Sequence, residues 1–429
     1  MFLKKNSKTF MHVWLQGLLA MSVAPIDLLL VIGIGEIESK AVAMSGVIIF
    51  TAFSMQIAVA QSVLNYTARS FSNTSKSTIS YLVYGIVISL ILVLPICVMA
   101  FHLDTLKVVD STTAHYIDRY MIYGILIIAL TSITVSLGFY LRSIGKSSIP
   151  FNGFCIEVPV NIILSFVLIN GTIYTPALGL EGAAIGSLIG RLFRLSWMLY
   201  HSSNISSAEV YFDTKINDLP EFTRVTLVMA ASGLGISLSA FVLNAIIIDY
   251  SAEEYIIYSL ICTVIPLLFT TGKAISVVVS IEVASSGSSE NLIKKFGAGI
   301  LYLPMIMGLV TFLILFANES YYLPGLVNLE NTLLIVMMFS LYGFLKSVSL
   351  IIGSGIMDVL KLHKEYFMIE QVKLWVGIVP FALFLNTAQH EGKLLYLSLA
   401  YVFFEVLTVL LMMVKVRAKK SHHKFANLV

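Results

Sequence analysis

The chain has 429 residues, of which 58% are hydrophobic and 12% charged, and its mean hydropathy is +0.91. This composition excludes a water-soluble globular protein, because too few polar side chains remain to cover the surface of a chain of this size. The net charge of +3 is small, and no basic groove for nucleic acid is visible. We therefore expect a membrane protein with no separate soluble domain and no nucleic-acid partner.

Long apolar segments follow one another from end to end of the sequence. A helix needs about 20 mostly apolar residues to cross about 30 Å of hydrocarbon, and these runs are too long and too evenly apolar for barrel strands. The predicted fold class is therefore all-α integral membrane, with about twelve transmembrane helices. Their expected ranges are 10–34, 41–66, 79–101, 115–141, 149–170, 179–201, 222–248, 254–284, 296–317, 331–352, 366–387 and 394–416.

The basic residues set the expected orientation. Alternate loops hold 20 Lys and Arg in one set and only Lys40, Lys107 and Lys393 in the other. The positive-inside rule places the richer set in the cytoplasm, and the two sets stay in phase only if the number of spans is even. Both termini are thus expected in the cytoplasm.

A polar connection near the middle of the sequence suggests two halves. We expect an N-terminal lobe at 1–201, a cytoplasmic linker at 202–221, a C-terminal lobe at 222–416 and a basic tail at 417–429. A faint repeat supports this division: Phe154, Ile156 and Glu157 recur as Phe367, Ile369 and Glu370, 213 residues later. Transporters are often built from two such repeats.

Asp27 lies inside the first expected span, where a charge costs about 2.5 to 3.5 kcal/mol on insertion scales. Pro25, two residues earlier, removes a backbone donor and frees carbonyl oxygens nearby. A proton or cation site at Asp27 is one reading. An acid neutralised by protonation or by a buried Lys is the other.

Glu157, Asn161 and Ser165 follow at i, i+4 and i+8 in the fifth expected span and so share one helix face. Their oxygens suit Na⁺, a hard cation, although hydrogen bonds that only pack helices would leave the same pattern. In the second half, Lys273, Lys346 and Glu405 lie deep in their spans, where an ion pair and a role in the substrate cavity are equally open. Glu370 and Lys373, one turn apart, are expected to neutralise each other and reach toward the cytoplasmic face.

The sequence shows no nucleotide-binding Gly-Lys loop, nucleophile triad or metal-ligand cluster, so we expect neither an enzyme nor a cofactor. An ion gradient remains as the energy source.

The segment between Leu141 and Arg191 resembles the MATE transporters (multidrug and toxic compound extrusion), which share a superfamily with lipid-linked oligosaccharide flippases. The resemblance rests on four stretches, Leu141-Arg142-Ser143-Ile144-Gly145, Asn161-Ile162-Ile163-Leu164, Leu168-Ile169-Asn170-Gly171, and Leu178-Gly179-Leu180-Glu181-Gly182-Ala183-Ala184-Ile185-Gly186-Ser187. The first span, in which Asp27 is followed after a short stretch by a Gly-rich loop, also resembles the opening segment of that family. The resemblance implies two six-helix bundles in a V, working as a monomer in the bacterial cytoplasmic membrane. It also implies export of an organic small molecule in exchange for Na⁺ or H⁺.

By the same resemblance, the cation or proton site of the N-terminal half would consist of Asp27, Asn161, Ser187 and the backbone carbonyl of Ala183. Where the family commonly carries a second Asp, this chain has Ser165. Our hypothesis is that Glu157 replaces that missing acid; the competing reading is that Glu157 pairs with a Lys of a neighbouring helix. The alternative function is a flippase for a lipid-linked oligosaccharide or a related lipid-linked precursor, which should hold pyrophosphate with several basic residues.

Overall fold

The computed structural model describes residues 7–32, 36–74, 77–103, 111–174, 176–203, 210–211, 218–247, 250, 252–286, 305–306, 309, 332–388 and 392–426. The expected span at 296–317 lies outside these ranges apart from three residues. The elements are α2 (Ser7–Ile32), α3 (Glu36–Thr74), β1 (Ser77–Thr78), α4 (Ser80–Ala100), α5 (Ser111–Ser143), α6 (Ser148–Asn170), α7 (Leu180–Ser203), β2 (Val210–Tyr211), α8 (Leu219–Ile247), α9 (Ala252–Ser286), α12 (Thr332–Leu350), the π-helix η1 (Ile351–Met357), α13 (His363–Val372), the π-helix η2 (Lys373–Ile378), α14 (Val379–Thr387) and α15 (Lys393–Ala426).

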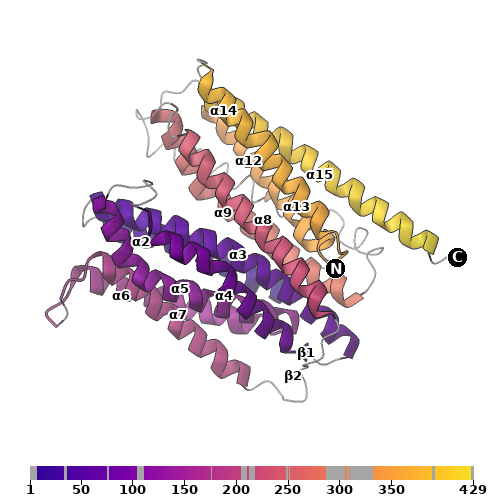
Figure 1. Ribbon diagram of the computed structural model, residues 1–429, viewed down its shortest axis with the longest axis horizontal. Coiled ribbons are helices and arrows are strands. Elements are labelled where there is room, and N and C mark those ends of the chain that lie inside the picture. Colours follow the sequence, from indigo (N-terminus) through magenta and orange to yellow (C-terminus); the bar gives the residue numbers. More distant parts are fainter. Residues whose placement is uncertain are drawn as a thin grey trace. The chain divides into compact units, whose positions relative to one another are not determined.

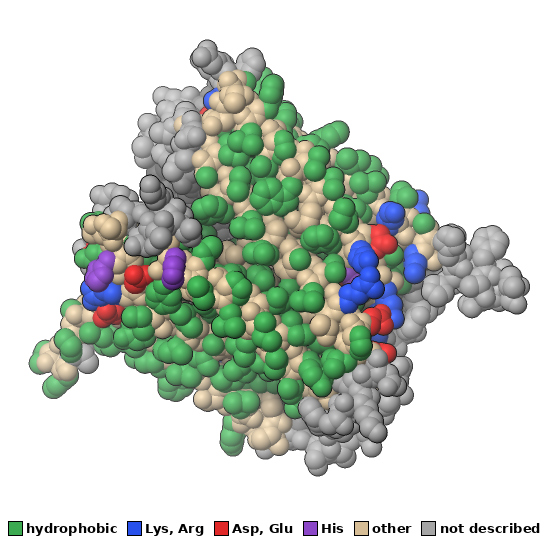
Figure 2. Space-filling model, viewed as in Figure 1, with side chains coloured by type: hydrophobic (Ala, Val, Ile, Leu, Met, Phe, Trp, Pro, Cys, Tyr) green, Lys and Arg blue, Asp and Glu red, His purple; other side chains and the backbone are tan. Residues whose placement is uncertain are grey.

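Eight helical stretches among the described residues are long and apolar enough to cross a membrane. They overlap eight of the twelve expected spans, for example Ser148–Asn170 against 149–170 and His363–Thr387 against 366–387. Large apolar side chains remain on their surfaces, such as Ile163, Val376 and Phe403, each more than 60% exposed. Figure 2 shows this hydrophobic covering on the visible face. A multi-pass, all-helical membrane protein is therefore confirmed, and the total of twelve spans stays a prediction.

The chain divides into two compact units, which are coloured indigo to magenta and mainly red to yellow in Figure 1. The N-terminal unit comprises Met11–Leu234, and the C-terminal unit comprises Gly235–Val429 together with Met1–Phe10. The boundary lies inside α8, after the linker expected at 202–221. Two residues of that linker form β2, which pairs in parallel with β1.

In the N-terminal unit, α6 and α7 pack closely because a stripe of small residues faces the partner helix. Gly182, Gly186 and Gly190 recur at four-residue spacing on α7. A Cβ on Gly182 would lie 2.6 Å from the carbonyl carbon of Leu168, and one on Gly190 would lie 3.0 Å from the carbonyl oxygen of Glu157. Small residues of this kind allow helix backbones to approach within a membrane. The polar residues of α6 and α7 are thereby brought into contact.

In the C-terminal unit, α12 packs against α9 and α15 around a core that includes Phe339, Ile378 and Leu397. Two π-helical segments interrupt its spans. Pro380 is the second residue of α14, two residues after η2 ends, and because it has no N–H it cannot complete a regular α-helical turn. The wider π turn accommodates that gap, and such segments are frequent at functional sites.

Candidate functional site

Four oxygen atoms of α6 and α7 form what we call the oxygen cluster. The Asn161 Oδ1 accepts hydrogen bonds from the hydroxyls of Ser165 at 2.9 Å and Ser187 at 3.1 Å. The Ser165 Oγ also lies 3.4 Å from the carbonyl oxygen of Ala183. All three side chains are buried. The structure thus brings together four of the six residues expected to bind the cation or proton.

Backbone approach at Gly186 makes the oxygen cluster possible. A Cβ at this position would lie 2.6 Å from the backbone nitrogen of Ser165, so any larger residue would push α6 and α7 apart. Asn161 and Ser165 lie one turn apart on α6, and Ser187 follows Gly186 on α7. A helix face and a glycine contact therefore place the amide and both hydroxyls within hydrogen-bonding distance of one another.

Asp27 belongs to α2, but the structure describes only its backbone and not its side chain. The predicted approach of Asp27 to Asn161 and Ser187 therefore stays a prediction. The four oxygens of the oxygen cluster carry no formal charge, so they offer a cation only dipoles. Any charged ligand for Na⁺, or any group that takes up a proton here, must come from another residue.

Glu157 lies two turns before Ser165 on α6, and it is bound by arginines of α7. The Nη1 of Arg194 donates to its Oε2 at 3.0 Å, and the Nε of Arg191 lies 3.7 Å from its Oε1. Glu157 and Arg194 are 4% and 2% exposed. The ion pair that the sequence left open is thus observed, with arginine rather than lysine as the partner. A Glu157 held in this way is poorly placed to serve as the missing second acid.

Sequence reasoning did not single out Arg142, because basic residues near span ends were assigned to the cytoplasmic loops. In the structure Arg142 is 6% exposed and donates through Nη2 to the Oε1 of Gln16 on α2. Its guanidinium also lies 4.7 Å from the ring centroid of Phe139. We call Arg142, Arg191 and Arg194, with Glu157, the arginine cluster.

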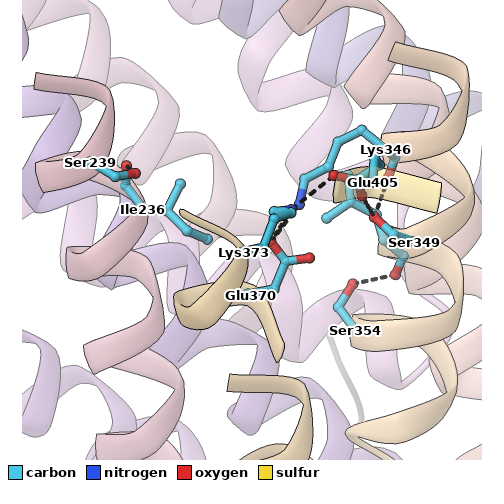
Figure 3. A network of polar contacts seen from close by, with 9 residues as sticks. Ile236, Ser239, Lys346, Ser349, Ser354, Glu370, Lys373 and Glu405 are labelled. Carbon is cyan, nitrogen blue, oxygen red and sulfur yellow. Dashed lines mark hydrogen bonds and ion pairs between the residues drawn. The ribbon is translucent and has the colours of Figure 1, made fainter. Parts of the chain in front are cut away.

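Four charged side chains of the C-terminal unit form the charge network shown in Figure 3: Lys346, Glu370, Lys373 and Glu405. The ammonium groups of Lys346 and Lys373 both donate to the Oε2 of Glu370, at 2.8 and 2.7 Å. Lys373 also donates to the Oε2 of Glu405 at 2.9 Å, and Ser349 donates to its Oε1. Two positive and two negative charges therefore balance within the bundle.

The charge network answers part of what the sequence left open. Lys346 and Glu405 both belong to it. Glu370 and Lys373 do neutralise each other, but the expectation that they reach toward the membrane surface is wrong, because their side chains are 1% and 2% exposed. A third helix supplies Glu405 and holds Lys373 inside. The Oε1 of Glu370 accepts no hydrogen bond from the described residues.

Asp358 is a buried acid that sequence analysis missed. It follows the last residue of η1 and is 1% exposed, and within the described residues neither of its carboxylate oxygens accepts a hydrogen bond. The Nδ1 of His363 lies 3.9 Å from its Oδ1. Burial raises the pKa of Asp358 to about 7, and the nearby charge of Lys273 offsets part of that shift. The sequence placed it between the expected spans at 331–352 and 366–387, so it looked like a loop residue.

No protein-family model and no curated protein matches the sequence. Solved structures do resemble it. An outward-facing multidrug resistance MATE family transporter of the MOP superfamily aligns with 97% of this chain and 96% of its own, at a TM-score of 0.75 and 16% identity. A eukaryotic MATE transporter, AtDTX14, aligns over 98% and 100% of the two chains, at a TM-score of 0.76 and 13% identity.

A MOP superfamily transporter from Pyrococcus furiosus, whose binding pocket is described as reversed in polarity, aligns over 96% of both chains, with a TM-score of 0.74 and 16% identity. These likenesses cover nearly the whole chain. The protein is thus a multi-pass helical membrane protein with the fold of the MATE transporters of the MOP superfamily. The resemblance predicted from Leu141 to Arg191 is confirmed at the level of the fold.

Proposed function

We propose that this protein is a secondary active exporter, which moves an organic small molecule out of the cell in exchange for Na⁺ or H⁺ by alternating access. The fold supports a transporter, since the similar structures are MATE and MOP transporters that match nearly end to end. A fold alone does not define an activity. The observation that carries the proposal is the oxygen cluster of Asn161, Ser165, Ala183 and Ser187.

The oxygen cluster fits ion coupling because its atoms suit either ion. Rotation of the two hydroxyl hydrogens would free lone pairs on four neighbouring oxygens, the ligand type that hard cations prefer. The same hydroxyls can instead donate to a carboxylate and hold it charged until a proton arrives. In this proposal Asp27 supplies the carboxylate, and Asn161, Ser165 and Ser187 hold it. Glu157 stays with Arg194.

Transport in proteoliposomes tests the proposal. The purified chain is reconstituted, an H⁺ or Na⁺ gradient is imposed, and uptake or release of a fluorescent organic cation such as ethidium is followed. We expect movement of the dye that requires one of the two gradients and stops with an ionophore that dissipates it. Asp27→Asn should abolish the coupled transport, and Asn161→Ala should slow it at least tenfold.

Asn170→Ala is the matched control for Asn161→Ala. Asn170 lies on the same helix and is exposed, and the one hydrogen bond of its side chain to a described residue is a donation to the carbonyl of Phe166 in its own helix. Its replacement should leave dye movement unchanged. Dye movement that ignores both gradients, or that survives in Asp27→Asn, would refute the exporter proposal.

The flippase alternative is less well supported by the charges of the C-terminal unit. A flippase for a lipid-linked precursor needs basic side chains that are available for pyrophosphate. Lys346 and Lys373 are instead bound to Glu370 and Glu405 in the charge network. We rank export of an organic molecule first because of the oxygen cluster, which suits ion coupling. A glycan defect without altered dye accumulation, in a bacterial host that lacks its own pumps and carries this chain, would reverse that order.

A further inference from the structure

The arginine cluster of the N-terminal unit carries more positive charge than its protein partners balance. Two guanidiniums contact the Glu157 carboxylate, that of Arg194 at 3.0 Å and that of Arg191 at 3.7 Å. The third, Arg142, has a neutral partner, Gln16, and among the described residues the charge that acts on it is that of Arg194, another cation. A buried charge without a counter-charge is costly in a folded protein. Counted over the described residues, the arginine cluster therefore keeps a net charge of two positive.

The buried donors of the arginine cluster are also incompletely used. Arg142 is 6% exposed and Arg194 is 2% exposed, and among the described residues neither Nε–H has an acceptor. The indole Nε1–H of Trp197, one turn beyond Arg194 on α7, also lacks an acceptor within the described part of the chain. Buried donors are nearly always paired in native structures. Three such donors on or beside one cationic cluster point to an acceptor other than the described residues.

The helices hold these groups in fixed positions. The Cγ of Arg194 and the Cδ1 of Trp197 would lie 3.1 and 3.5 Å from a Cβ on Gly153, so both side chains lie against the same point of α6. The Arg194 guanidinium lies 4.0 Å from the ring centroid of Phe154. The Nη1 of Arg191 donates a hydrogen bond to the hydroxyl of Thr131 on α5. The Arg191 side chain is 20% exposed, so it forms the solvent-accessible edge of the arginine cluster. The arrangement is preorganised for a ligand rather than dispersed over the surface.

We propose that the arginine cluster binds a phosphate group, either free or as the headgroup of an anionic lipid. Guanidiniums bind phosphate through pairs of parallel N–H donors, and a phosphate monoanion or dianion would offset the uncompensated charge. Arg142 lies one residue before the end of α5, at the side that the positive-inside rule assigns to the cytoplasm. Basic sites between helices on that side commonly hold lipid phosphates. The proposal does not depend on the transported substrate.

Ligand-induced stabilisation of the purified full-length chain in detergent tests the site. The probes are inorganic phosphate and dioctanoyl phosphatidylglycerol, with dioctanoyl phosphatidylcholine as a lipid of no net charge. A ligand that binds only the folded state raises the unfolding temperature, and above the dissociation constant the rise grows with the logarithm of the ligand concentration. We expect a rise that depends on concentration in this way with at least one of the two anionic probes and none with phosphatidylcholine. A rise with phosphatidylglycerol alone assigns the site to lipid, and a rise with inorganic phosphate assigns it to a free anion.

Variants show whether the stabilisation arises at the arginine cluster. Arg142→Gln should weaken the affinity at least tenfold, and Arg191→Gln, at the solvent-accessible edge, should weaken it in the same direction if Arg142→Gln fails to fold. Glu157→Gln removes the competing carboxylate and should strengthen the affinity, an effect that structural damage does not produce. Arg119→Gln is the matched control, because Arg119 is 43% exposed and paired with Glu181 elsewhere on α5 and α7. Absence of any rise, or an equal rise in Arg142→Gln and Arg191→Gln, overturns the proposal.

Discussion

The Asp358 carboxylate couples the stability of the C-terminal unit to pH. Burial raises its pKa to about 7, so the folded chain holds this proton at a pH where the unfolded chain has released it. Stability must then fall as the pH rises, because the folded state binds more protons. Between about pH 5 and pH 8, we expect the unfolding temperature in detergent to decrease, and Asp358→Asn to remove part of that decrease.

The control variant for Asp358→Asn is Glu365→Gln. Glu365 is an acid near the start of α13, and it is only partly buried, whereas Asp358 is fully buried. The pH dependence of that variant should match that of the parent chain. The charge of Lys273 acts on Asp358, and the Nδ1 of His363 lies 3.9 Å from its Oδ1, so the substitution should remove part of the decrease and not all of it. An Asp358→Asn curve that superimposes on the parent curve would show that the carboxylate has no such role.

Lys373 is the residue that joins the two acids of the charge network. Lys373→Met leaves Glu405 without its ammonium partner inside the bundle, and removal of one partner from a buried pair typically costs about 3 to 5 kcal/mol. The double variant Lys373→Met with Glu405→Gln restores a balanced pair of Lys346 and Glu370, so it should recover part of that loss. Thermal unfolding of the parent chain, Lys373→Met, Glu405→Gln and the double variant gives the coupling energy between Lys373 and Glu405. A double variant no more stable than Lys373→Met would contradict the ion-pair account.

At the scale of single residues, the sequence predicted which polar side chains share one face of a helix, but it did not predict which side chains meet across two helices. Asn161 and Ser165 could be placed on one face because their spacing follows the helix period. The partner of Glu157 could not be found in this way, since it depends on the register of α6 against α7. Arg194 was assigned to a loop from charge counting, although it is 2% exposed. A charge near a span end does not reveal whether it faces water or a neighbouring helix.

At the scale of helices, the close contact between α6 and α7 depends on Gly186. In Gly186→Ala the new Cβ would overlap Ser165, and overpacking of this kind costs about 1 to 3 kcal/mol. The separation of the helices should also draw Ser165 away from the Ala183 carbonyl and slow ion-coupled transport. Unfolding temperature and dye transport check the two effects.

Gly46→Ala on α3 is the matched control for the glycine prediction. Nothing lies within 4 Å of a Cβ at Gly46, so the substitution adds a methyl group in open space. Alanine is also the better helix former by about 1 kcal/mol. The control should therefore be unchanged or slightly more stable. Equal losses in both variants would show that the α6–α7 approach is not what glycine provides.

The π-helical segments mark the limit of prediction at the element scale. The expected spans at 331–352 and 366–387 were continuous helices, whereas the structure has η1 after Leu350 and η2 from Lys373 to Ile378. Hydropathy reports only that a segment is apolar, and it contains no information about hydrogen-bond register. Pro380 was the available signal for η2, because its missing N–H disturbs the preceding turn.

At the scale of the whole chain, the faint repeat has a physical counterpart. Glu157 and Glu370, 213 residues apart, are both buried acids bound by basic residues of their own unit. The partners differ, since Arg194 lies on the next helix along the chain and Lys373 lies on the same span as Glu370. The repeat thus preserves the position of an acid and not its ion pair. Composition and periodicity were sufficient for the helical fold, because continuous apolar runs in a membrane leave few alternatives.

The orientation of the chain is the remaining whole-molecule prediction. The loops with 20 of the basic residues should face the cytoplasm, together with both termini, and the connection between α6 and α7 should face outward. Alkaline phosphatase requires disulfides and so is active only outside the cytoplasm. Fused after residue 429 it should be inactive, and inserted at Thr172 it should be active. Green fluorescent protein at the C-terminus should fluoresce. An active phosphatase at residue 429 would mean an odd number of spans, and the two sets of loops would then no longer alternate.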